Sequence, residues 1–524
     1  MKRRDFCKGL AVTLAAGTLA PAAALPQAGA ATALVGRAVP DDYYTLWYRS
    51  DRCGADLRHD YYYSDSLFDH PATEYDNQLA LATLGMAAAA DCPWESDQRY
   101  WMEGEVGRAD HIRDAFAKLG FTEVQLFNYT HSLNDTPDTV GCAIARKTLV
   151  RGGRQVTIIG AFLRGSGYGA EWSGNLHAGP GSAHVGFVTA TRQLVEKIRA
   201  YVQTSAKRQP LGTLKLWMGG YSRGGGVANL VAARLPAVLP QLEKKNTFVY
   251  TFAAPASLTA ADCPDLQQDY DNNHAADGSL KKDWGTSNIF NIVSSGDVIP
   301  RILPAEWGFY RNGNDRFLPS TVIPEELQAL NDRSAGMEGT PIDFGRLAVM
   351  EEVDAVLRSM MDLFCDRQTY YEDYEDAMRC MLQCATTRTE EEVTRGIVRD
   401  DAAVVAQLRS MELMQRFPQE KLERCVQAAS ALSRPVLEKL GSAVPLQAQQ
   451  IVIPMLAVGL CFELQPETVQ LVADFVLSTI TVEGQLSGIL KTVLCHFQEN
   501  YITVLEAYDP ADHGMTPYTR REEL

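Results

Sequence analysis

Apolar runs of strand length alternate with amphipathic segments of helix length along the first part of the chain. Strand patterns cover residues 122–127, 141–150, 154–163, 214–218, 247–252 and 288–293, and helix patterns cover 77–90, 109–119 and 184–204. The two strand patterns on either side of Arg151-Gly152-Gly153 predict a β-hairpin with a glycine turn. Strands that alternate with helices predict an α/β fold, a mostly parallel sheet with helices on both faces. We assign this fold to residues 31–318.

The pattern changes after residue 318, where strand patterns become scarce. Helix patterns cover residues 344–364, 370–384, 390–415, 419–432, 446–459 and 466–477. Short connections between them are typical of a compact helical bundle. The sequence therefore predicts a large all-α insertion, or cap, at 319–485 and a return of the chain to the α/β domain at 486–524. The apolar stretch at 451–462 is too short to cross a membrane and is typical of a buried helix.

Tyrosines are concentrated in the segment before the first helix pattern, at positions 43, 44, 48 and 61–63. Their rings could line a lipid-facing mouth of a site, or they could pack against the body of the domain. We expect packing, because large rings contribute most when their apolar surface is buried.

The one basic cluster of the chain stands at its start. Lys2-Arg3-Arg4-Asp5-Phe6-Cys7-Lys8 precedes an alanine-rich apolar stretch at 10–25 and Ala28-Gly29-Ala30. Two adjacent arginines ahead of a weakly hydrophobic stretch resemble a twin-arginine export signal, and the small residues supply a cleavage site after Ala30. The alternative is an ordinary N-terminal helix with a basic start. The first interpretation predicts an exported bacterial protein, extracellular, periplasmic or in the cell envelope, that loses residues 1–30.

Composition and charge narrow the class of protein. The chain has 46% hydrophobic and 22% charged residues, which is ordinary for a globular protein, and a formal net charge of −16. Because nucleic acids are bound by basic surfaces, this balance argues against a nucleic-acid partner. Among the 11 cysteines, Cys380 and Cys384 stand one helical turn apart without a second pair of ligands. We therefore expect buried thiols there rather than a zinc site.

The sequence around Ser222 has the pattern of a nucleophile elbow. Gly220-Tyr221-Ser222-Arg223-Gly224 follows the strand pattern at 214–218 and precedes a helix pattern rich in Gly and Ala. In a strand–turn–helix setting, G-x-S-x-G places the serine on a sharp turn with its hydroxyl above the edge of the sheet. A glycine-rich structural turn is the alternative. We favour Ser222 as a nucleophile because strand and helix patterns flank it in the required order.

A serine nucleophile needs a general base and an acid that orients the base. Asp297 follows the strand pattern at 288–293, which places it at the sheet edge where ligands gather. The histidines beyond the serine are His274, His496 and His513. The usual order of serine, acid and histidine excludes the first of them. His496 precedes a helix pattern, which would hold its ring better than the polar tail around His513, but both remain candidates.

These motifs together resemble the class 3 (fungal-type) lipase family of α/β-hydrolases. The matching stretches, in family order, are Arg164-Gly165-Ser166 for its R-G-S/T, Trp172…Asn175-Leu176 for W-x-x-N-L, His184-Val185-Gly186-Phe187 for H-x-G-F, Gly220–Gly225 for G-H-S-L-G-G, Phe252-Ala253-Ala254-Pro255 for F-G-x-P, Asp297–Arg301 for D-x-V-P-R and His496…Tyr501 for H-x-x-x-x-Y. The resemblance implies a catalytic triad of Ser222, Asp297 and His496, and so favours His496 over His513. It also implies an oxyanion hole.

By this resemblance, the oxyanion hole would consist of the backbone N–H groups of Arg223 and Ser166. The Ser166 hydroxyl can serve as a further donor. Two neighbours of the serine depart from the family pattern, because Tyr221 and Arg223 replace the usual His and Leu. The Arg223 side chain could favour an anionic substrate or pair with an acidic neighbour, and we expect the pair. The predicted cap, which separates Asp297 from His496, has no counterpart in the family pattern.

Residues and resemblance together predict a secreted serine hydrolase of the lipase or carboxylesterase type. It would cleave acyl esters, of lipids in particular, through an acyl-enzyme, and needs no metal or other cofactor. The expected partners are a small acyl ester or lipid substrate and, transiently, a lipid interface. Two other classes remain open. One is an amide, thioester or peptide acyl hydrolase on the same fold, and the other is a non-catalytic binding protein on a hydrolase scaffold.

Overall fold

The computed structural model places most of the segments that carry the predicted strands. The described residues are 37–50, 55–91, 109–129, 138–166, 174–175, 184–257, 285–294, 297, 299–301, 309–318, 375–386, 399–440, 446–463, 496–510 and 516–517. The chain separates into two compact units, Met1–Val35 and Gly36–Leu524, and every described residue belongs to the second. The expected signal at 1–30 and the expected helices at 344–364 and 466–477 lie outside the described residues.

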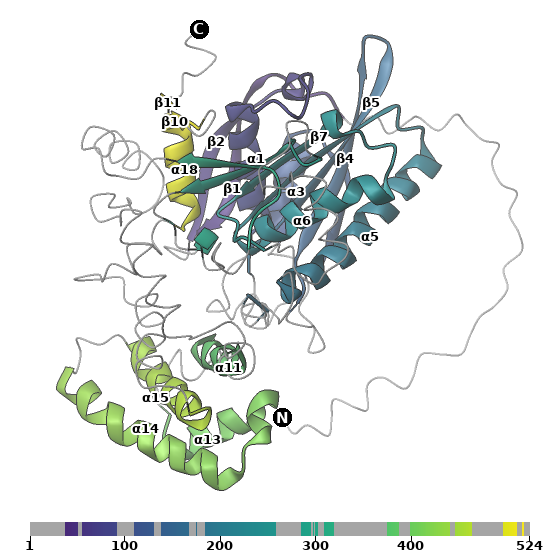
Figure 1. Cartoon of the computed structure of the whole chain (residues 1–524). Helices are drawn as coiled ribbons and strands as arrows, with labels where there is room; N and C mark the ends of the chain where they lie inside the picture. The colour runs from purple at the N-terminus through teal and green to yellow at the C-terminus, as the bar shows by residue number, and fades with distance from the viewer. Residues whose placement is uncertain are drawn as a thin grey trace, which may run out of the picture. The chain divides into compact units, whose positions relative to one another are not determined.

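Seven strands of the second unit form one sheet (Figure 1). In spatial order its strands are β3 (Thr122–Phe127), β4 (Cys142–Arg151), β5 (Arg154–Leu163), β6 (Thr213–Tyr221), β7 (Thr247–Phe252), β8 (Ile289–Ser294) and β9 (Asn314–Leu318). The first three strands pair antiparallel, and every later strand pairs parallel with the one before it. The predicted α/β fold class with a mostly parallel sheet is confirmed. Strand β9 was not predicted, because its five residues, NDRFL, carry too few apolar positions to give a strand pattern.

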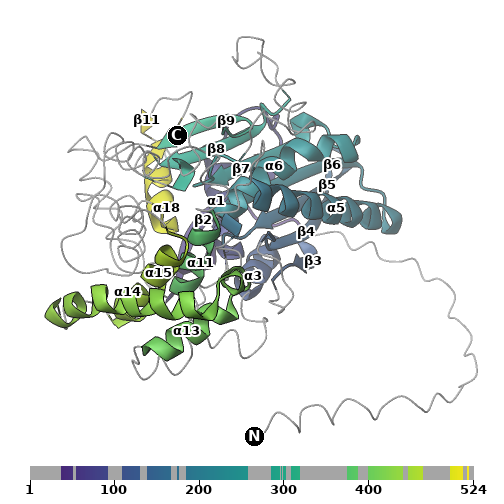
Figure 2. The same cartoon turned by 60° about the horizontal axis from the view of Figure 1, so that its bottom comes forward.

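Helices cover both faces of this sheet (Figures 1 and 2). The helices are α1 (Asn77–Ala90), α3 (Asp110–Lys118), α5 (Val185–Arg208) and α6 (Arg223–Val238). Along β6 successive side chains point to opposite faces: Trp217 belongs to the core cluster of α1 and α3, whereas Leu216 and Met218 belong to that of α5 and α6. Trp217 is fully buried and donates its indole N–H to the Thr83 hydroxyl of α1 at 2.7 Å. The sheet is therefore the middle of three layers.

A β-hairpin precedes the first helix and was not predicted as such. Strands β1 (Asp42–Ser50) and β2 (Ala55–Tyr63) pair antiparallel, and β1 alternates between buried and more exposed positions. Tyr48, Tyr61 and Tyr63 are buried in the core cluster of α1. Of the two possibilities for the tyrosine-rich segment, packing against the body of the domain is the one found for these three rings.

The described part of the C-terminal return contains helix α18 (Gln498–Ala507) and the short strands β10 (Tyr508–Asp509) and β11 (Thr516–Pro517). Asn77, at the start of α1, donates its side-chain N–H to the Leu505 carbonyl at 3.1 Å. The first helix of the domain and helix α18 are therefore in direct contact. Short 3-10 helices occupy Asp65–Phe68, Lys244–Asn246, Ile299–Arg301 and Glu412–Arg416.

Helices alone make up the described part of the predicted cap. They are α11 (Glu375–Thr386), α13 (Asp401–Ser410), α14 (Gln419–Leu440) and α15 (Leu446–Cys461), which share a core cluster. Cys380 and Cys384 are buried side chains of this cluster, as expected. Helix α14 extends beyond the predicted end at residue 432, and α13 is shorter than the pattern at 390–415. The predicted domain boundaries themselves stay predictions.

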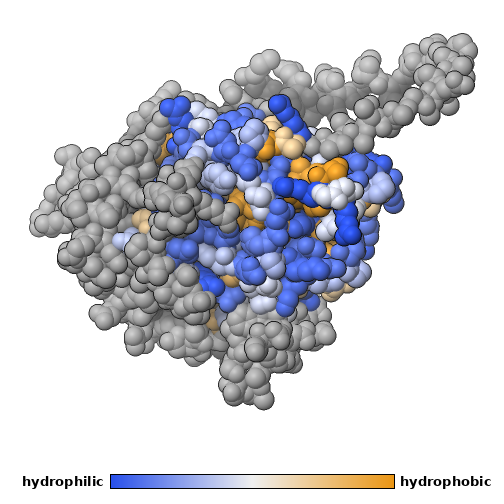
Figure 3. Space-filling view, turned by 90° about the horizontal axis from the view of Figure 1, so that it is seen from above, coloured by the Kyte–Doolittle hydropathy of each residue, from blue (hydrophilic) through white to orange (hydrophobic). Residues whose placement is uncertain are grey.

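The described surface is largely polar. Figure 3 shows one face on which hydrophilic residues predominate around a smaller group of hydrophobic ones. Val150, near the tip of the β4–β5 hairpin, is the large apolar side chain that is strongly exposed within the described ranges. Across those same ranges, every helix is too short or too polar to cross a lipid bilayer.

Candidate active site

Ser222 occupies a sharp turn between β6 and α6. Its φ of 53° and ψ of −124° lie outside the regions that L-residues commonly adopt. Neighbouring glycines make the turn possible, since a Cβ on Gly220 would lie 2.5 Å from the carbonyl carbon of Gly224, and a Cβ on Gly224 would lie 2.5 Å from the Leu163 oxygen. The observed turn thus explains both glycines of the G-x-S-x-G pattern.

Backbone hydrogen bonds hold the serine in this unusual conformation. The Ser222 N–H donates to the Phe252 carbonyl at the end of β7 at 2.9 Å, and the Ser222 carbonyl accepts from the Gly226 N–H at 3.0 Å. One bond fixes the turn to the neighbouring strand and the other starts helix α6. The local strain is therefore balanced by the elements on either side, an arrangement often found at reactive residues.

His496 joins Ser222 to Asp297. Its Nε2 lies 2.9 Å from Ser222 Oγ, and its Nδ1 lies 2.9 Å from Asp297 Oδ2. Because the carboxylate is an acceptor, Nδ1 carries the proton in the neutral imidazole and Nε2 offers its lone pair to the serine O–H. The His496 side chain is 18% exposed and that of Asp297 is 0% exposed. This chain of groups can take a proton from Ser222.

Asp297 is held by donors on both of its oxygens. The Tyr501 hydroxyl donates to Oδ2 at 2.7 Å, and the Ile299 N–H donates to Oδ1 at 2.9 Å. The Tyr501 oxygen in turn accepts the Ser294 N–H at 3.0 Å, which fixes the ring to the end of β8. These bonds satisfy a buried carboxylate and determine the direction in which it faces His496.

Tyr221, the residue before the candidate nucleophile, contacts the backbone of the candidate base. Its hydroxyl donates to the backbone carbonyl of His496 at 2.6 Å. Its ring packs edge-on against Tyr501, with ring centroids 5.5 Å apart. Burial, together with the nearby Tyr501 and Asp297, raises the pKa of Tyr221 well above its ordinary value. The hydroxyl therefore stays protonated and remains a hydrogen-bond donor.

The loop after β5 lies beside the serine turn. Leu163 of β5 pairs with Gly220 of β6 in parallel register, so Ser166 follows at the same sheet edge as Ser222. Ser166 Oγ accepts a hydrogen bond from Asn175 Nδ2 at 2.8 Å. Backbone N–H groups from this loop and from the start of α6 can therefore converge on the oxygen of a bound acyl group.

The Arg223 side chain is buried and hydrogen-bonded. It is 1% exposed, and its Nε and Nη2 atoms donate to the Thr139 carbonyl at 3.1 and 2.9 Å. Its Nη1 atom donates to Asn175 Oδ1 at 2.8 Å, and the guanidinium lies 5.0 Å from the centroid of the Phe187 ring. A guanidinium buried in this way does not present an open cation to a substrate. The contacts therefore contradict the first of the two possible roles, a preference for an anionic substrate.

A buried carboxylate connects the Ser166 loop to the His496 segment. Asp91, the residue after α1, accepts the Gly165 N–H at 3.1 Å on Oδ1. Its Oδ2 accepts a side-chain N–H of Gln498 at 2.6 Å, two residues beyond His496. Asp91 therefore sets the position of the candidate oxyanion loop relative to that of the candidate base.

Residues 165–307 match the lipase (class 3) family model. The chain is class 3 lipase-like. The predicted resemblance is confirmed, and the match indicates a serine ester hydrolase of the lipase type. It includes Ser166, Ser222 and Asp297, whereas His496 lies beyond it, after the helical segment.

Solved fungal lipases are similar to this chain. The lipase–propeptide complex of Rhizomucor miehei is 20% identical, covering 46% of this chain and 68% of that one with a TM-score of 0.31. Lipase II from Rhizopus niveus is 17% identical over 46% of this chain and 80% of its own, with a TM-score of 0.30. The lipase of Rhizopus microsporus var. chinensis is 18% identical over 47% and 75%, with a TM-score of 0.31. No curated protein matches the chain.

The structure brings together Ser222, Asp297 and His496, and it places Ser166 and Arg223 on either side of Asn175. The competing histidines, at positions 274 and 513, lie outside the described residues. Sequence reasoning assigned no role to Tyr221, Tyr501 or Asn175. Tyr501 belongs to the H-x-x-x-x-Y motif and Asn175 to the W-x-x-N-L motif. The motifs identified these two residues, but their hydrogen bonds could not be read from the sequence.

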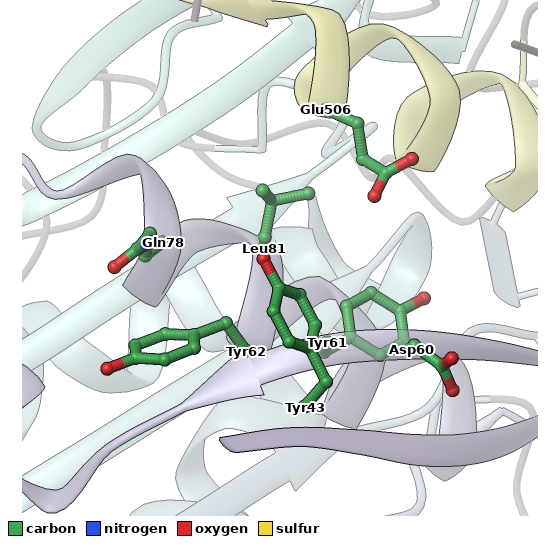
Figure 4. A pocket seen from close by; sticks show the side chains of 7 residues that line it. All are labelled: Tyr43, Asp60, Tyr61, Tyr62, Gln78, Leu81 and Glu506. Atoms are coloured by element: carbon green, nitrogen blue, oxygen red, sulfur yellow. The ribbon is translucent and has the colours of Figure 1, made fainter. Parts of the chain in front are cut away.

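A small cavity of about 20 Å³ lies elsewhere in the α/β domain (Figure 4). Its lining comes from the β1–β2 hairpin, α1 and the end of α18: Tyr43, Asp60, Tyr61, Tyr62, Gln78, Leu81 and Glu506. Glu506 is near the opposite end of α18 from His496, about 15 Å along the helix axis. A space that holds one water has no room for an acyl chain, so this cavity is not the substrate site.

Proposed function

We propose that this lipase-like protein is an exported lipase or carboxylesterase in which Ser222, His496 and Asp297 form the catalytic triad. The observation that supports it most directly is the position of His496, whose two ring nitrogens each lie 2.9 Å from an oxygen of the other two residues. The order of the residues in the chain, serine then acid then histidine, is the order found in α/β-hydrolases.

In this proposal Ser222 Oγ attacks the ester carbonyl while His496 Nε2 takes the hydroxyl proton. His496 then returns the proton to the leaving alcohol, which leaves an acyl group on Ser222. Water, deprotonated by the same imidazole, hydrolyses the acyl-enzyme. Asp297 keeps the imidazole in the tautomer that the first step needs and stabilises the imidazolium.

The negative oxygen of the tetrahedral intermediate is held by the N–H of Arg223 and by the N–H and hydroxyl of Ser166. Loss of one such donor costs about 3 kcal/mol of transition-state stabilisation. The Arg223 N–H suits this role because it is the first of helix α6, whose N-terminal N–H groups have no partner within the helix. The same helix end also carries a partial positive charge that favours an oxyanion.

The substrate that we propose is an acyl ester of a lipid, bound from a lipid interface with which the enzyme makes transient contact. The class 3 lipase match supports a lipid or ester substrate. The helical segment at 319–485 would cover the site and supply an apolar groove for the acyl chain, a hypothesis that rests on its place in the chain between acid and base. If deletion of this segment left the acyl-chain preference unchanged, the groove hypothesis would be wrong.

Labelling with a fluorophosphonate probe tests the proposed nucleophile and base. We expect the intact protein to be labelled, Ser222→Ala to give no labelling, His496→Ala to give very slow labelling, and His513→Ala to be labelled normally. Normal labelling of His496→Ala combined with loss in His513→Ala would assign the base to the tail. An intact, folded protein inert to the probe would instead favour the non-catalytic scaffold.

Matched esters, thioesters and amides that carry the same acyl groups then test the reaction class. The proposal predicts faster turnover of esters, with a preference for longer acyl chains presented in micelles. A preference for the amides would replace it with the amidase alternative.

Export by the twin-arginine route completes the proposal. In a bacterial host with that pathway, we expect the mature protein outside the cytoplasm to begin at Ala31, and the Arg3→Lys/Arg4→Lys variant to stay inside. A protein that remains in the cytoplasm with an intact N-terminus would contradict the export.

A further inference from the structure

The hydrogen-bond directions around Asn175 follow from the chemistry of its two neighbours. Arg223 lies on one side, with Nη1 2.8 Å from Oδ1, and Ser166 lies on the other, with Oγ 2.8 Å from Nδ2. A guanidinium can only donate hydrogen bonds. The atom of Asn175 that faces it must therefore be the amide oxygen, which turns the amide nitrogen toward Ser166.

The orientation of the amide in turn fixes the role of Ser166. The Asn175 Nδ2 group donates, so the Ser166 oxygen accepts, and the hydroxyl hydrogen of Ser166 cannot point at Asn175. A serine hydroxyl has one hydrogen to donate, and here that hydrogen is kept for another acceptor. Ser166 stands at the sheet edge beside Ser222, where an oxyanion would form.

Arg223 is well suited to orient the Asn175 amide because its own side chain is held in place. Two of its nitrogens are bonded to the Thr139 carbonyl, and its guanidinium lies over the Phe187 ring. Phe187 stacks on His184, with ring centroids 3.9 Å apart, and His184 Nε2 lies 2.7 Å from the Asn175 carbonyl oxygen. Asn175 is therefore held by both its side chain and its backbone.

We propose that the Arg223 side chain is a positioning residue, which orients the Asn175 amide so that the Ser166 hydroxyl donates to the oxyanion. The inference rests on the proposed function of this site. Arg223 thereby serves the oxyanion hole twice, through its own backbone N–H and, by way of Asn175, through the hydroxyl of Ser166. This role accounts for an Arg side chain at a position where the family pattern has Leu.

Without the guanidinium, nothing in this chain of contacts keeps the amide in one orientation. An Asn side chain that turns by 180° exchanges its oxygen and nitrogen with almost no change of shape. Its oxygen would then face Ser166 and take the hydroxyl hydrogen. The oxyanion would lose a donor although Ser166 and all backbone N–H groups remained in place.

A double-mutant cycle in the full chain separates this role from a structural one. The variants are Ser166→Ala, Arg223→Met and the two combined, and kcat and KM are measured on a soluble short-chain ester. We expect Ser166→Ala to lower kcat by about 100- to 1,000-fold. We expect Arg223→Met to lower kcat by at least about tenfold with little change in KM, since the lost contact acts in the transition state. The combined variant should resemble Ser166→Ala alone, since Arg223 has no hydroxyl left to orient.

Multiplicative losses in the combined variant would overturn the proposal, because they would show that Arg223 acts without Ser166. Asn175→Asp provides a second test that leaves the guanidinium in place. A carboxylate has only acceptor oxygens, so it would take the Ser166 hydroxyl hydrogen, and kcat should fall as in Arg223→Met. Should Arg223→Met fail to fold, the cycle of Asn175→Asp with Ser166→Ala decides by the same criterion. Full activity of a folded Asn175→Asp variant would also refute the proposal.

Two controls separate failure of this inference from failure of the proposed function. If Ser222→Ala retains full activity, the proposed nucleophile is wrong, whatever the cycle shows. Lys147→Met removes another fully buried cation, one bonded to Asp65 and the Leu119 carbonyl rather than to the site. It should lower stability and leave kcat of the folded enzyme unchanged, whereas a similar loss of kcat there would mark the Arg223 effect as unspecific.

Discussion

The Tyr221 hydroxyl donates a hydrogen bond of 2.6 Å to the backbone carbonyl of His496, 275 residues further along the chain. Tyr221 precedes the proposed nucleophile, and His496 is the proposed base. The bond therefore fixes the backbone of His496 to the turn that carries Ser222. Tyr501, which orients Asp297, packs against the same ring. One aromatic pair thus contacts all three segments of the proposed triad.

Tyr221→Phe removes only the hydroxyl of this contact. We expect a loss of about 1 kcal/mol in the free energy of unfolding, the usual net value of one hydrogen bond. Because the His496 backbone becomes less restrained, kcat/KM on a short-chain ester should fall by about five- to tenfold. Both quantities can be measured on the same preparation, by chemical denaturation and by initial rates.

Tyr201→Phe is the matched control, since Tyr201 also donates from its hydroxyl to a backbone carbonyl, that of Glu123 at 2.9 Å. It lies on α5, away from the three triad segments. A similar stability loss with unchanged kinetics is expected. Equal kinetic losses in the two variants would show that the Tyr221 contact has no special effect on the base.

Tyr501→Phe should have a larger effect. It removes one of the donors to the Asp297 carboxylate and leaves the Ser294 N–H without its acceptor. An unsatisfied buried donor costs about 1–3 kcal/mol of stability. A carboxylate that no longer holds His496 in line should lower kcat by up to about 100-fold, and rates of fluorophosphonate labelling will measure the loss.

Tyr250 gives the comparison for this prediction. Its hydroxyl accepts the Asp76 N–H at 3.2 Å, so Tyr250→Phe also leaves a backbone N–H without its partner. It should lower stability but not the labelling rate. Should Tyr501→Phe label as fast as the unchanged protein, the idea that Tyr501 orients Asp297 would have to be abandoned.

Much of the α/β domain was predictable from local patterns. The buried strands β6, β7 and β8 are short apolar runs, and the glycine spacing around Ser222 reflects a steric need of the turn itself. The assignment of His496 depended on the family motif, because its neighbours in sequence do not reveal its distance to Ser222. The structure adds that distance and supports the choice.

Other features could not be predicted because they depend on residues far apart in the chain. The bonds of Tyr221 to His496 and of Asp91 to Gln498 form only when the C-terminal segment returns to the domain. The β1–β2 hairpin was missed for a different reason, since its strands mix tyrosines with charged residues and only one side of each is buried. Burial, which distinguishes them from a loop, is a property of the assembled domain.

Gly224→Ala tests the steric basis of the turn at Ser222. The added methyl group would lie 2.5 Å from the Leu163 oxygen, and the atoms that it meets belong to the backbone and cannot move aside cheaply. We expect a loss of several kcal/mol in stability or no soluble protein, and no fluorophosphonate labelling. Expression level, thermal unfolding and labelling together check the outcome.

Gly153 in the β4–β5 turn offers the contrast, since a Cβ there meets no atom within 4 Å and φ is +75°. Asn tolerates this left-handed conformation, so Gly153→Asn should be nearly neutral. If Gly224→Ala were equally well tolerated and remained reactive, the turn would not need the close approach seen between β5 and α6.

The buried ion pair of Lys147 and Asp65 should matter for stability and not for catalysis. The Lys147 amine lies 2.5 Å from Asp65 Oδ1, and both side chains are almost fully buried. Lys147→Met leaves a buried carboxylate without its cation, which should cost about 3–5 kcal/mol. Asp65→Asn added to it removes the uncompensated charge, so the double variant should recover much of that loss in denaturant unfolding, with fluorophosphonate labelling unchanged throughout. If the double variant is less stable than Lys147→Met alone, the two side chains do not act as a charge pair.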